Sequence, residues 1–160
     1  MIILGIDPGT TRIGYALLKK EKNGDAKLID CGCLEILNET QIKRLGIISD
    51  QIGRLTLKHR PEILAIERLF FNKNIKTAMA VSEARGVIIN SANSLGLKIL
   101  EFTPLQVKTA ITGYGRAKKL EVQKMICLIL NLKKAPQPDD TSDAIAIGLA
   151  ACYTNEKLLI

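Results

Sequence analysis

The sequence predicts a single α/β domain in which α-helices flank a mixed five-stranded β-sheet. Short apolar runs bounded by turn residues indicate strands, and longer runs with apolar residues three and four positions apart indicate helices. Three strands come first and then helices alternate with strands, an order typical of layered α/β domains. The 160 residues, 47% of them hydrophobic, suffice for one core. We therefore expect one domain over residues 1–160.

Five short segments are expected to form the strands. The first, IILGID, is an apolar run that ends at Pro8-Gly9, as a buried strand followed by a turn would. Short polar turns separate the first three segments, which favours an antiparallel meander. The fourth segment, EILAIE, is equally apolar and ends on an acid. The predicted strands are residues 2–7, 13–19, 27–36, 62–67 and 97–102.

The helices follow from a longer period. Between residues 39 and 59 an apolar residue recurs every three or four positions, which is the spacing of one helix face. Pro61 then prevents this helix from continuing. A short helix is expected to begin near Pro104 and to break at Gly113-Tyr114-Gly115. The other predicted helices are residues 77–94, 117–131 and 140–153.

The chain is basic, with a formal net charge of +7 and a pI of about 9.3. Such a surplus suggests a polyanionic partner, because Lys and Arg side chains attract phosphates and release their counterions. Charge alone does not separate nucleic-acid binding from a merely basic surface. The first residues do not resemble a signal peptide, and uncharged apolar runs are too short to span a membrane. We expect a cytoplasmic protein without membrane contacts.

Histidine and cysteine usage excludes several kinds of site. Cys31 and Cys33 form one Cys-x-Cys pair, which is a weak zinc signal and more typical of reduced buried thiols. The single histidine, His59, precedes Arg60-Pro61, where a helix should end. Metal sites rich in histidine are therefore excluded, and a Ser-His-Asp triad would have to use this connector residue.

Acids close two of the predicted strands. Asp7 ends the first strand and Glu67 ends the fourth, and ligand sites of such sheets form at the carboxyl ends of strands. If the two strands are neighbours, the carboxylates face each other. Each acid alone could instead be the first solvated residue after a buried strand.

Three more acids open the last, strongly apolar helix. Asp140 and Asp143 are three residues apart and so share one helix face. Capping is the alternative, with Asp139 or Asp140 as the N-cap and Asp143 favoured by the helix dipole. Capping does not explain why Asp143 leads directly into an apolar stripe, where an uncompensated charge is costly.

Together, Asp7, Glu67, Asp140 and Asp143 could bind two Mg²⁺ ions through oxygen atoms alone, with phosphate oxygens completing the coordination. Two such ions ~3.5–4 Å apart can activate a water and stabilise the leaving 3′ oxygen in phosphodiester hydrolysis. This chemistry requires neither histidine nor cysteine. The pattern thus predicts a magnesium-dependent nuclease.

At these residues the sequence resembles the RuvC family of Holliday junction resolvases, which cut four-way DNA junctions. The resemblance implies an RNase H-like fold, a homodimer and paired symmetric nicks, with roles in DNA recombination and repair. It covers essentially the whole chain in order. The matching segments are GIDPGTTRIGYA at 5–16, PEILAIERLFFNKN at 61–74, EARG at 83–86, QVK at 106–108, GYGRAKKLEVQKM at 113–125 and PDDTSDAIAIGLA at 138–150.

The resemblance assigns roles to individual residues. The family's four metal-binding and catalytic acids fall on Asp7, Glu67, Asp140 and Asp143, and the spacing selects Asp140 over Asp139. The loop before this pair differs by one residue from relatives, so Asp139 remains the alternative.

Other roles concern the DNA. Phe70 resembles the aromatic that stacks on an unpaired base at the junction centre, and such stacking contributes ~1–3 kcal/mol per base. Lys108 and Lys119 match family lysines near the active site, where a cation could contact the scissile phosphate. Lys119 lies at a helix start, where a phosphate would offset its unfavourable position. Further expected DNA contacts, each of which could equally be a solvated surface charge, are Arg68, Lys73, Lys76, Arg85, Arg116 and Lys118.

The resemblance also implies partners. The helix over 77–94 is rich in small residues, which permit close helix approach, and in the family a helix here contributes to the dimer. An internal packing helix is the alternative. Besides four-way junction DNA, the resemblance implies a branch-migration motor complex (RuvA and RuvB) as partner.

Three other functions are compatible with part of the pattern. An actin- or sugar-kinase-like ATPase would share the Asp-x-Gly-Thr turn, but it needs two such domains. A YqgF-like RNase H relative acting on RNA has a similar acidic layout, whereas Phe70 and the segment at 113–125 favour the junction enzyme. A nucleic-acid-binding module without catalysis would leave the four acids unexplained.

Overall fold

The computed structural model describes residues 1–69 and 75–154, with side chains described for all of these except residues 75–77. The strands are β1 (Ile2–Asp7), β2 (Arg12–Lys20), β3 (Ala26–Glu35), β4 (Ile63–Glu67) and β5 (Lys98–Phe102). The helices are α1 (Gln41–His59), α2 (Ile75–Ser94), α3 (Pro104–Thr112), α4 (Lys119–Ile129) and α5 (Asp139–Tyr153).

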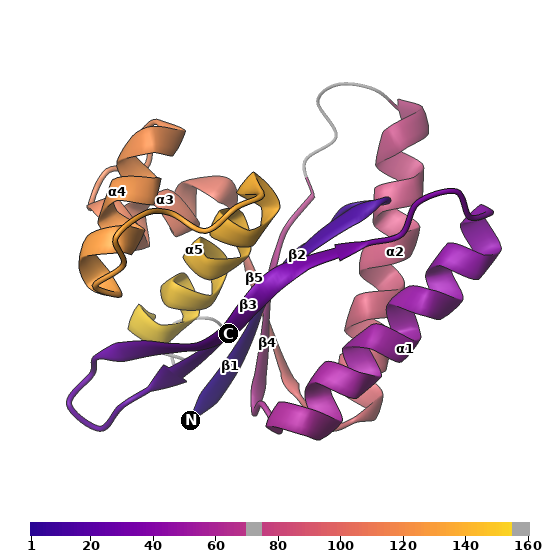
Figure 1. The fold of residues 1–160 in the computed structure, drawn as a ribbon, viewed down its shortest axis with the longest axis horizontal. Coiled ribbons are helices and arrows are strands. Elements are labelled where there is room, and N and C mark those ends of the chain that lie inside the picture. Colours follow the sequence, from indigo (N-terminus) through magenta and orange to yellow (C-terminus); the bar gives the residue numbers. More distant parts are fainter. Residues whose placement is uncertain (70–74, 155–160) are drawn as a thin grey trace.

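One sheet separates two layers of helices (Figure 1). Its strand order is β3-β2-β1-β4-β5. The first three strands form the predicted antiparallel meander, while β1, β4 and β5 are parallel to one another. The mixed five-stranded α/β fold predicted from the sequence is therefore confirmed.

Each face of the sheet has its own core. On one face, the apolar residues of β1, β2 and β4 pack against α1 and α2, with Ile48, Ile52 and Ile88 fully buried. On the other face, alternate residues of the same strands pack against α3, α4 and α5. The alternation follows from the two-residue repeat of a strand, whose successive side chains point to opposite faces.

The predicted element boundaries are confirmed to within two residues, and the differences have local causes. The helix predicted from residue 117 begins at Lys119, because a Glu121 Oε2 atom accepts a hydrogen bond of 2.6 Å from the Lys118 backbone N–H and fixes the first turn there. Its end precedes Asn131, whose φ of 53° is left-handed. These shifts leave the order of elements unchanged.

Helix α5 lies closest to the sheet because glycines permit it. A Cβ atom at Gly5 of β1 would collide with the carbonyl oxygen of Ala144 and lie 2.8 Å from the backbone nitrogen of Gly148. A Cβ at Gly14 of β2 would likewise collide with the carbonyl oxygen of Asp140. Since residues 144–152 of α5 are all buried, this helix is the centre of its layer.

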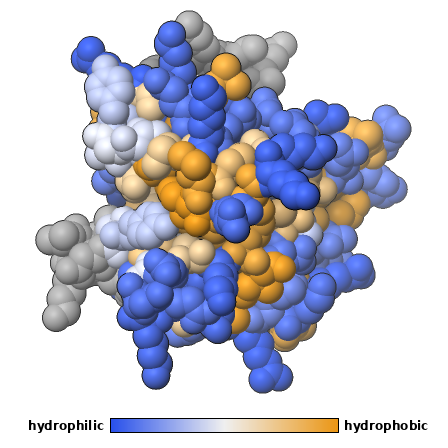
Figure 2. Space-filling view, turned by 60° about the vertical axis from the view of Figure 1, so that its left-hand side comes forward, coloured by the Kyte–Doolittle hydropathy of each residue, from blue (hydrophilic) through white to orange (hydrophobic). Residues whose placement is uncertain are grey.

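The outer surface of the α3–α5 layer is partly apolar. Figure 2 shows hydrophobic side chains gathered among hydrophilic ones on the face that this layer presents. Leu120 and Leu128 of α4 are largely exposed, and they border a groove that Lys124 and Lys133 also line. In the described parts of the chain, no helix is both long enough and apolar enough to span a membrane.

Candidate active site

Asp7 and Glu67 end the neighbouring parallel strands β1 and β4. The register pairs the isoleucines that precede them, so the two acids occupy equivalent positions one residue further along. Ile3 and Ala65, each an even number of residues before its acid, lie in the core on the α5 side. Because strand side chains alternate, both carboxylates also face α5. The sequence predicted that the two carboxylates would face each other if their strands were neighbours, and the structure confirms that β1 and β4 are neighbours.

Helix α5 begins at the same edge of the sheet. Its N-cap is Pro138, and in the described structure no side chain caps its first turn. The alternative explanation by capping is therefore wrong for Asp139 and Asp140, which occupy the first helical positions rather than the N-cap. Proline suits this place because its fixed φ is compatible with a helix start. Asp139 and Asp140, both in the first turn, keep the favourable interaction with the helix dipole.

The close approach at Gly14 places Asp140 beside Asp7. Gly14 is the β2 partner of Asp7 in the antiparallel register. The backbone of Asp140 rests on this glycine, whose missing side chain provides the space. Asp143, three residues later, lies on the same face of the helix as Asp140. The four acids predicted from the sequence thus come from three elements that meet at one edge.

Two lysines face the acids from the other helices of this layer. Lys108 lies on α3 and Lys119 begins α4. The Lys119 Nζ atom is 2.9 Å from Oδ2 of Asp143 and 3.2 Å from Oδ2 of Asp139. The positive charge at the start of α4 is therefore offset by carboxylates of α5, where the sequence had suggested a phosphate.

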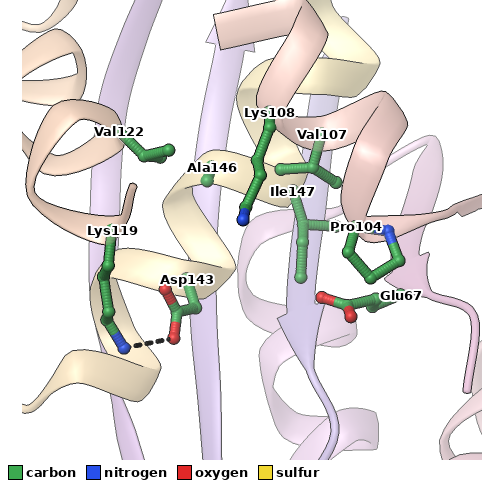
Figure 3. Close-up of a pocket in the computed structure, with 9 residues that line it drawn as sticks. All are labelled: Glu67, Pro104, Val107, Lys108, Lys119, Val122, Asp143, Ala146 and Ile147. Carbon is green, nitrogen blue, oxygen red and sulfur yellow. Dashed lines mark hydrogen bonds and ion pairs between the residues drawn. The ribbon is translucent and has the colours of Figure 1, made fainter. Parts of the chain in front are cut away.

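A cavity of about 220 Å³ opens between these charged groups (Figure 3). The charged residues that line it are Glu67, Lys108, Lys119 and Asp143. Its apolar lining consists of Pro104, Val107, Val122, Ala146 and Ile147. Opposite charges from three helices and one strand thus converge on one small space that is open to solvent.

The electrostatics show that the acids act on one another. The pKa of Asp7 is raised from an ordinary 3.8 to about 7, chiefly by burial and also by the charges of Asp143, Glu67 and Asp140, while Lys119 acts in the opposite sense. Four carboxylates that share a site disfavour each other's ionised forms. A cation among them would relieve this repulsion.

The pKa values of Glu67 and Lys119 also depend on the neighbouring charges of the site. Burial raises the pKa of Glu67, the charge of Asp143 raises it as well, and Lys108 acts in the opposite sense. Burial lowers the pKa of Lys119, but its hydrogen bonds to Asp143 and Asp139 and their charges outweigh burial and raise it. Lys119 therefore stays protonated next to the acids.

The donor set fits a hard divalent cation such as Mg²⁺, which prefers carboxylate oxygens. The side chains are not yet arranged around one point: within residues 1–69 and 75–154, no three His, Cys, Asp or Glu side chains form a group that could hold a metal as they stand. One reason is visible, because the Lys119 ammonium engages Asp143. Side-chain rotation would be needed to complete a metal site.

Arg85, predicted as a DNA contact, makes structural contacts. Its Nε atom donates a hydrogen bond of 3.0 Å to the backbone carbonyl of Glu67, and its guanidinium forms an ion pair with Glu101 of β5. Its side chain is only 17% exposed. The DNA contact stays a prediction, while the observed contacts tie α2 to the end of β4. The sequence analysis did not identify Glu101 as a partner of Arg85. The feature that could have indicated it is a single acid within an otherwise apolar strand.

The other predicted DNA contacts are described in part. Arg68 directly follows β4, and Arg116 and Lys118 precede α4; all three are exposed, and they lie near the ends of elements that bear the acids and Lys119. Their roles stay predictions. Phe70 and Lys73 lie outside the described residues, as does the side chain of Lys76.

The sheet begins with an antiparallel meander and continues with parallel strands. Acids lie on the first and fourth strands and on the last helix of the domain. This arrangement is typical of the RNase H-like class. Comparison with known proteins narrows this class. The family model described as crossover junction endodeoxyribonuclease RuvC matches residues 3–152. Over 160 residues the chain is 46% identical to the enzyme of that name from Halothermothrix orenii, covering 99% of this chain and 95% of the relative. The chain belongs to the RuvC family of crossover junction endodeoxyribonucleases.

Solved structures agree with this placement. RuvC of T. thermophilus in complex with a Holliday junction substrate superposes with a TM-score of 0.90 at 33% identity, covering 96% of this chain and 93% of that one. The yeast mitochondrial Holliday junction resolvase Ydc2 has a TM-score of 0.72 at 13% identity, which shows the fold alone. The resemblance inferred from the sequence segments and the RNase H-like fold that it implied are confirmed.

Proposed function

We propose that this protein is an endonuclease that resolves four-way DNA junctions by paired symmetric nicks during recombination and repair. The observation that carries the proposal is the convergence of Asp7, Glu67, Asp140 and Asp143, which is expressed in the raised pKa of Asp7. Family membership supplies the substrate class, since the curated relatives are crossover junction endodeoxyribonucleases.

Within the proposed site, the four acids would hold two Mg²⁺ ions. When bound, these ions supply an activated water and stabilise the leaving oxygen of the phosphodiester. The chain itself contributes carboxylates whose backbone positions are set by the strand ends and by α5. Ionised carboxylates repel one another at this edge, so the site is electrostatically prepared for cations.

The lysines would bind the substrate phosphate. Lys108 and Lys119 line the same cavity as Glu67 and Asp143, so an ammonium group there can contact a phosphate that approaches the acids (Figure 3). A positively charged donor fixed near developing negative charge lowers the barrier to phosphodiester cleavage. The exposed Arg68, Arg116 and Lys118 would bind the flanking DNA backbone.

Symmetric cutting requires two active sites, and a homodimer would provide them. Helix α2 supports this: one face, with Ala84 and Ile88, is buried in the core, while Met79 is 63% exposed. A Cβ atom at Gly86 would meet no atom within 4 Å, which leaves room for close approach of a second helix. We further propose a cytoplasmic location and association with a RuvA–RuvB branch-migration motor, both from the family.

The test is cleavage of a synthetic four-way junction with Mg²⁺. We expect paired nicks in two opposite strands and little action on linear duplex of the same sequence. Asp7→Asn should abolish cleavage, because one of the metal-holding carboxylates is lost, while gel-shift binding of the junction persists. Asp50→Asn, on the exposed surface of α1, is the matched control and should cut like the wild type.

Two outcomes would contradict the proposal. Cleavage by Asp7→Asn at the wild-type rate would show that the carboxylate cluster does not take part in catalysis. Faster cutting of single-stranded RNA than of the junction would favour the RNA-directed relative.

A further inference from the structure

Asp139 is an acid of α5 that the four-carboxylate site leaves without a role. It lies four residues before Asp143 and therefore on the same side of the helix. Its Oδ2 atom is 3.2 Å from Lys119 Nζ, while its Oδ1 atom accepts a hydrogen bond of 3.3 Å from Gln123 Nε2. The two oxygens are thus oriented by two residues of α4, one turn apart.

This environment differs from that of Asp140. The carboxylates whose charges raise the pKa of Asp7 are Asp143, Glu67 and Asp140. Asp139 instead makes its described contacts with α4, and its side chain is 56% exposed. The two neighbouring acids therefore act on different groups: the charge of Asp140 acts on Asp7, whereas Asp139 contacts Lys119 and Gln123.

Lys119 requires such a partner. Its side chain is long and 47% exposed, and it begins a helix whose N-terminus disfavours positive charge. At present its ammonium lies between Asp139 and Asp143. If Asp143 serves as a metal ligand, its oxygens are shared with the metal, and Asp139 becomes the main carboxylate that retains the ammonium at the cavity.

We propose that Asp139 is a positioning residue, which holds the Lys119 ammonium at the cavity beside Asp143 and ligates no metal. The inference rests on the proposed nuclease function, because it assigns to Lys119 the contact with the scissile phosphate. It also assigns different roles to two adjacent acids, of which the sequence spacing favoured Asp140 as the ligand and left Asp139 as the alternative: Asp140 serves the metal site, and Asp139 serves the lysine.

The test is a double-mutant cycle in single-turnover junction cleavage at saturating protein. Asp139→Asn should lower the cleavage rate constant about tenfold by loosening Lys119, and Lys119→Ala should lower it about 100-fold. In the Lys119→Ala background, Asp139→Asn should change the rate less than about twofold, because its effect acts through the lysine. Asp139→Glu, which keeps a carboxylate, should recover part of the rate.

The second readout is the Mg²⁺ concentration that gives half-maximal rate. For Asp139→Asn it should stay within about twofold of the wild type, whereas Asp140→Asn should raise it at least about tenfold or abolish cleavage. Thermal unfolding of each variant checks that the fold persists.

Failure of the nuclease function and failure of the Asp139 role give different results. If the wild type cuts no junction, the proposed function fails. If the wild type cuts, but Asp139→Asn raises the Mg²⁺ requirement like Asp140→Asn, or keeps its full effect without Lys119, the positioning role is overturned.

Discussion

The two halves of the acidic site are built in different ways. The strand half, Asp7 and Glu67, is placed by the register of two hydrogen-bonded parallel strands. The helix half, Asp140 and Asp143, is placed by side-by-side packing of α5 on the sheet, where Gly14 leaves the space. Backbone hydrogen bonds fix the first half directly, whereas the second half depends on how closely two surfaces approach.

This difference implies different sensitivities. Removing a carboxylate from the strand half should leave its backbone in place and relieve repulsion. A small side chain added below the helix half should shift both of its acids at once without altering either of them. The strand half also has an external support, since Arg85 binds the Glu67 carbonyl from α2.

The largest expected effect on stability is that of Asp7→Asn. The pKa of Asp7 is raised to about 7 in the folded chain from 3.8, so its ionisation opposes folding as pH rises through that window. Without divalent ions, we expect the variant to be more stable than the wild type by about 2–4 kcal/mol at pH 8. The difference should disappear below about pH 3, where Asp7 of the wild type is protonated in both the folded and the unfolded chain.

Urea unfolding at several pH values measures this difference. Added Mg²⁺ should reduce it, because a cation stabilises the ionised wild-type site. Asp50→Asn on the exposed surface of α1 serves as control and should show no such pH dependence. A variant less stable than the wild type at pH 8 would mean that the acids do not repel one another in the folded protein.

Gly14→Ala tests the helix half. The added Cβ atom would collide with the Asp140 carbonyl oxygen and lie 3.2 Å from the Thr141 backbone nitrogen, so α5 must move away from β2. We expect a loss of stability of about 1–3 kcal/mol and cleavage slowed about 100-fold by displaced acids. Junction cleavage and urea unfolding, measured on the same preparation, give the two values.

The matched control is Gly46→Ala in α1, where an added Cβ atom meets no atom within 4 Å. Because alanine favours helices more than glycine does, this variant should gain about 0.5–1 kcal/mol and retain full activity. Wild-type cleavage by Gly14→Ala would show that the close approach of α5 is not needed to place its acids.

Arg85→Lys should have the smallest effect. A lysine keeps the charge near Glu101 but cannot reproduce both the ion pair and the Nε hydrogen bond to the Glu67 carbonyl. We expect a loss of about 1 kcal/mol in stability and a few-fold higher Mg²⁺ requirement for cleavage. The exposed Arg54→Lys on α1 is the control. If the two variants have the same stability and the same Mg²⁺ requirement, Arg85 does not support the strand half.

The sequence predicted the strand half more completely than the helix half. Asp7 and Glu67 each end an apolar run, and the only unknown was whether their strands are neighbours. For the helix half, the spacing placed Asp140 and Asp143 on one face but could not exclude capping, which was settled by Pro138 as N-cap. The contacts of Asp139 and Arg85 join residues distant in sequence, and no local pattern encodes such pairs.

The acids of both halves share one site, and an NMR titration of the Asp7 carboxyl group tests this arrangement directly. The aspartate carboxyl carbons are labelled, and the Asp7 signal is assigned as the one that is missing in the spectrum of Asp7→Asn. Without divalent ions, we expect the pKa of Asp7 to be about 7. The pKa should fall in Asp140→Asn, which removes a repelling charge, and fall again in the wild type on addition of Mg²⁺. A pKa near the ordinary 3.8 that neither the substitution nor Mg²⁺ changes would contradict the shared site.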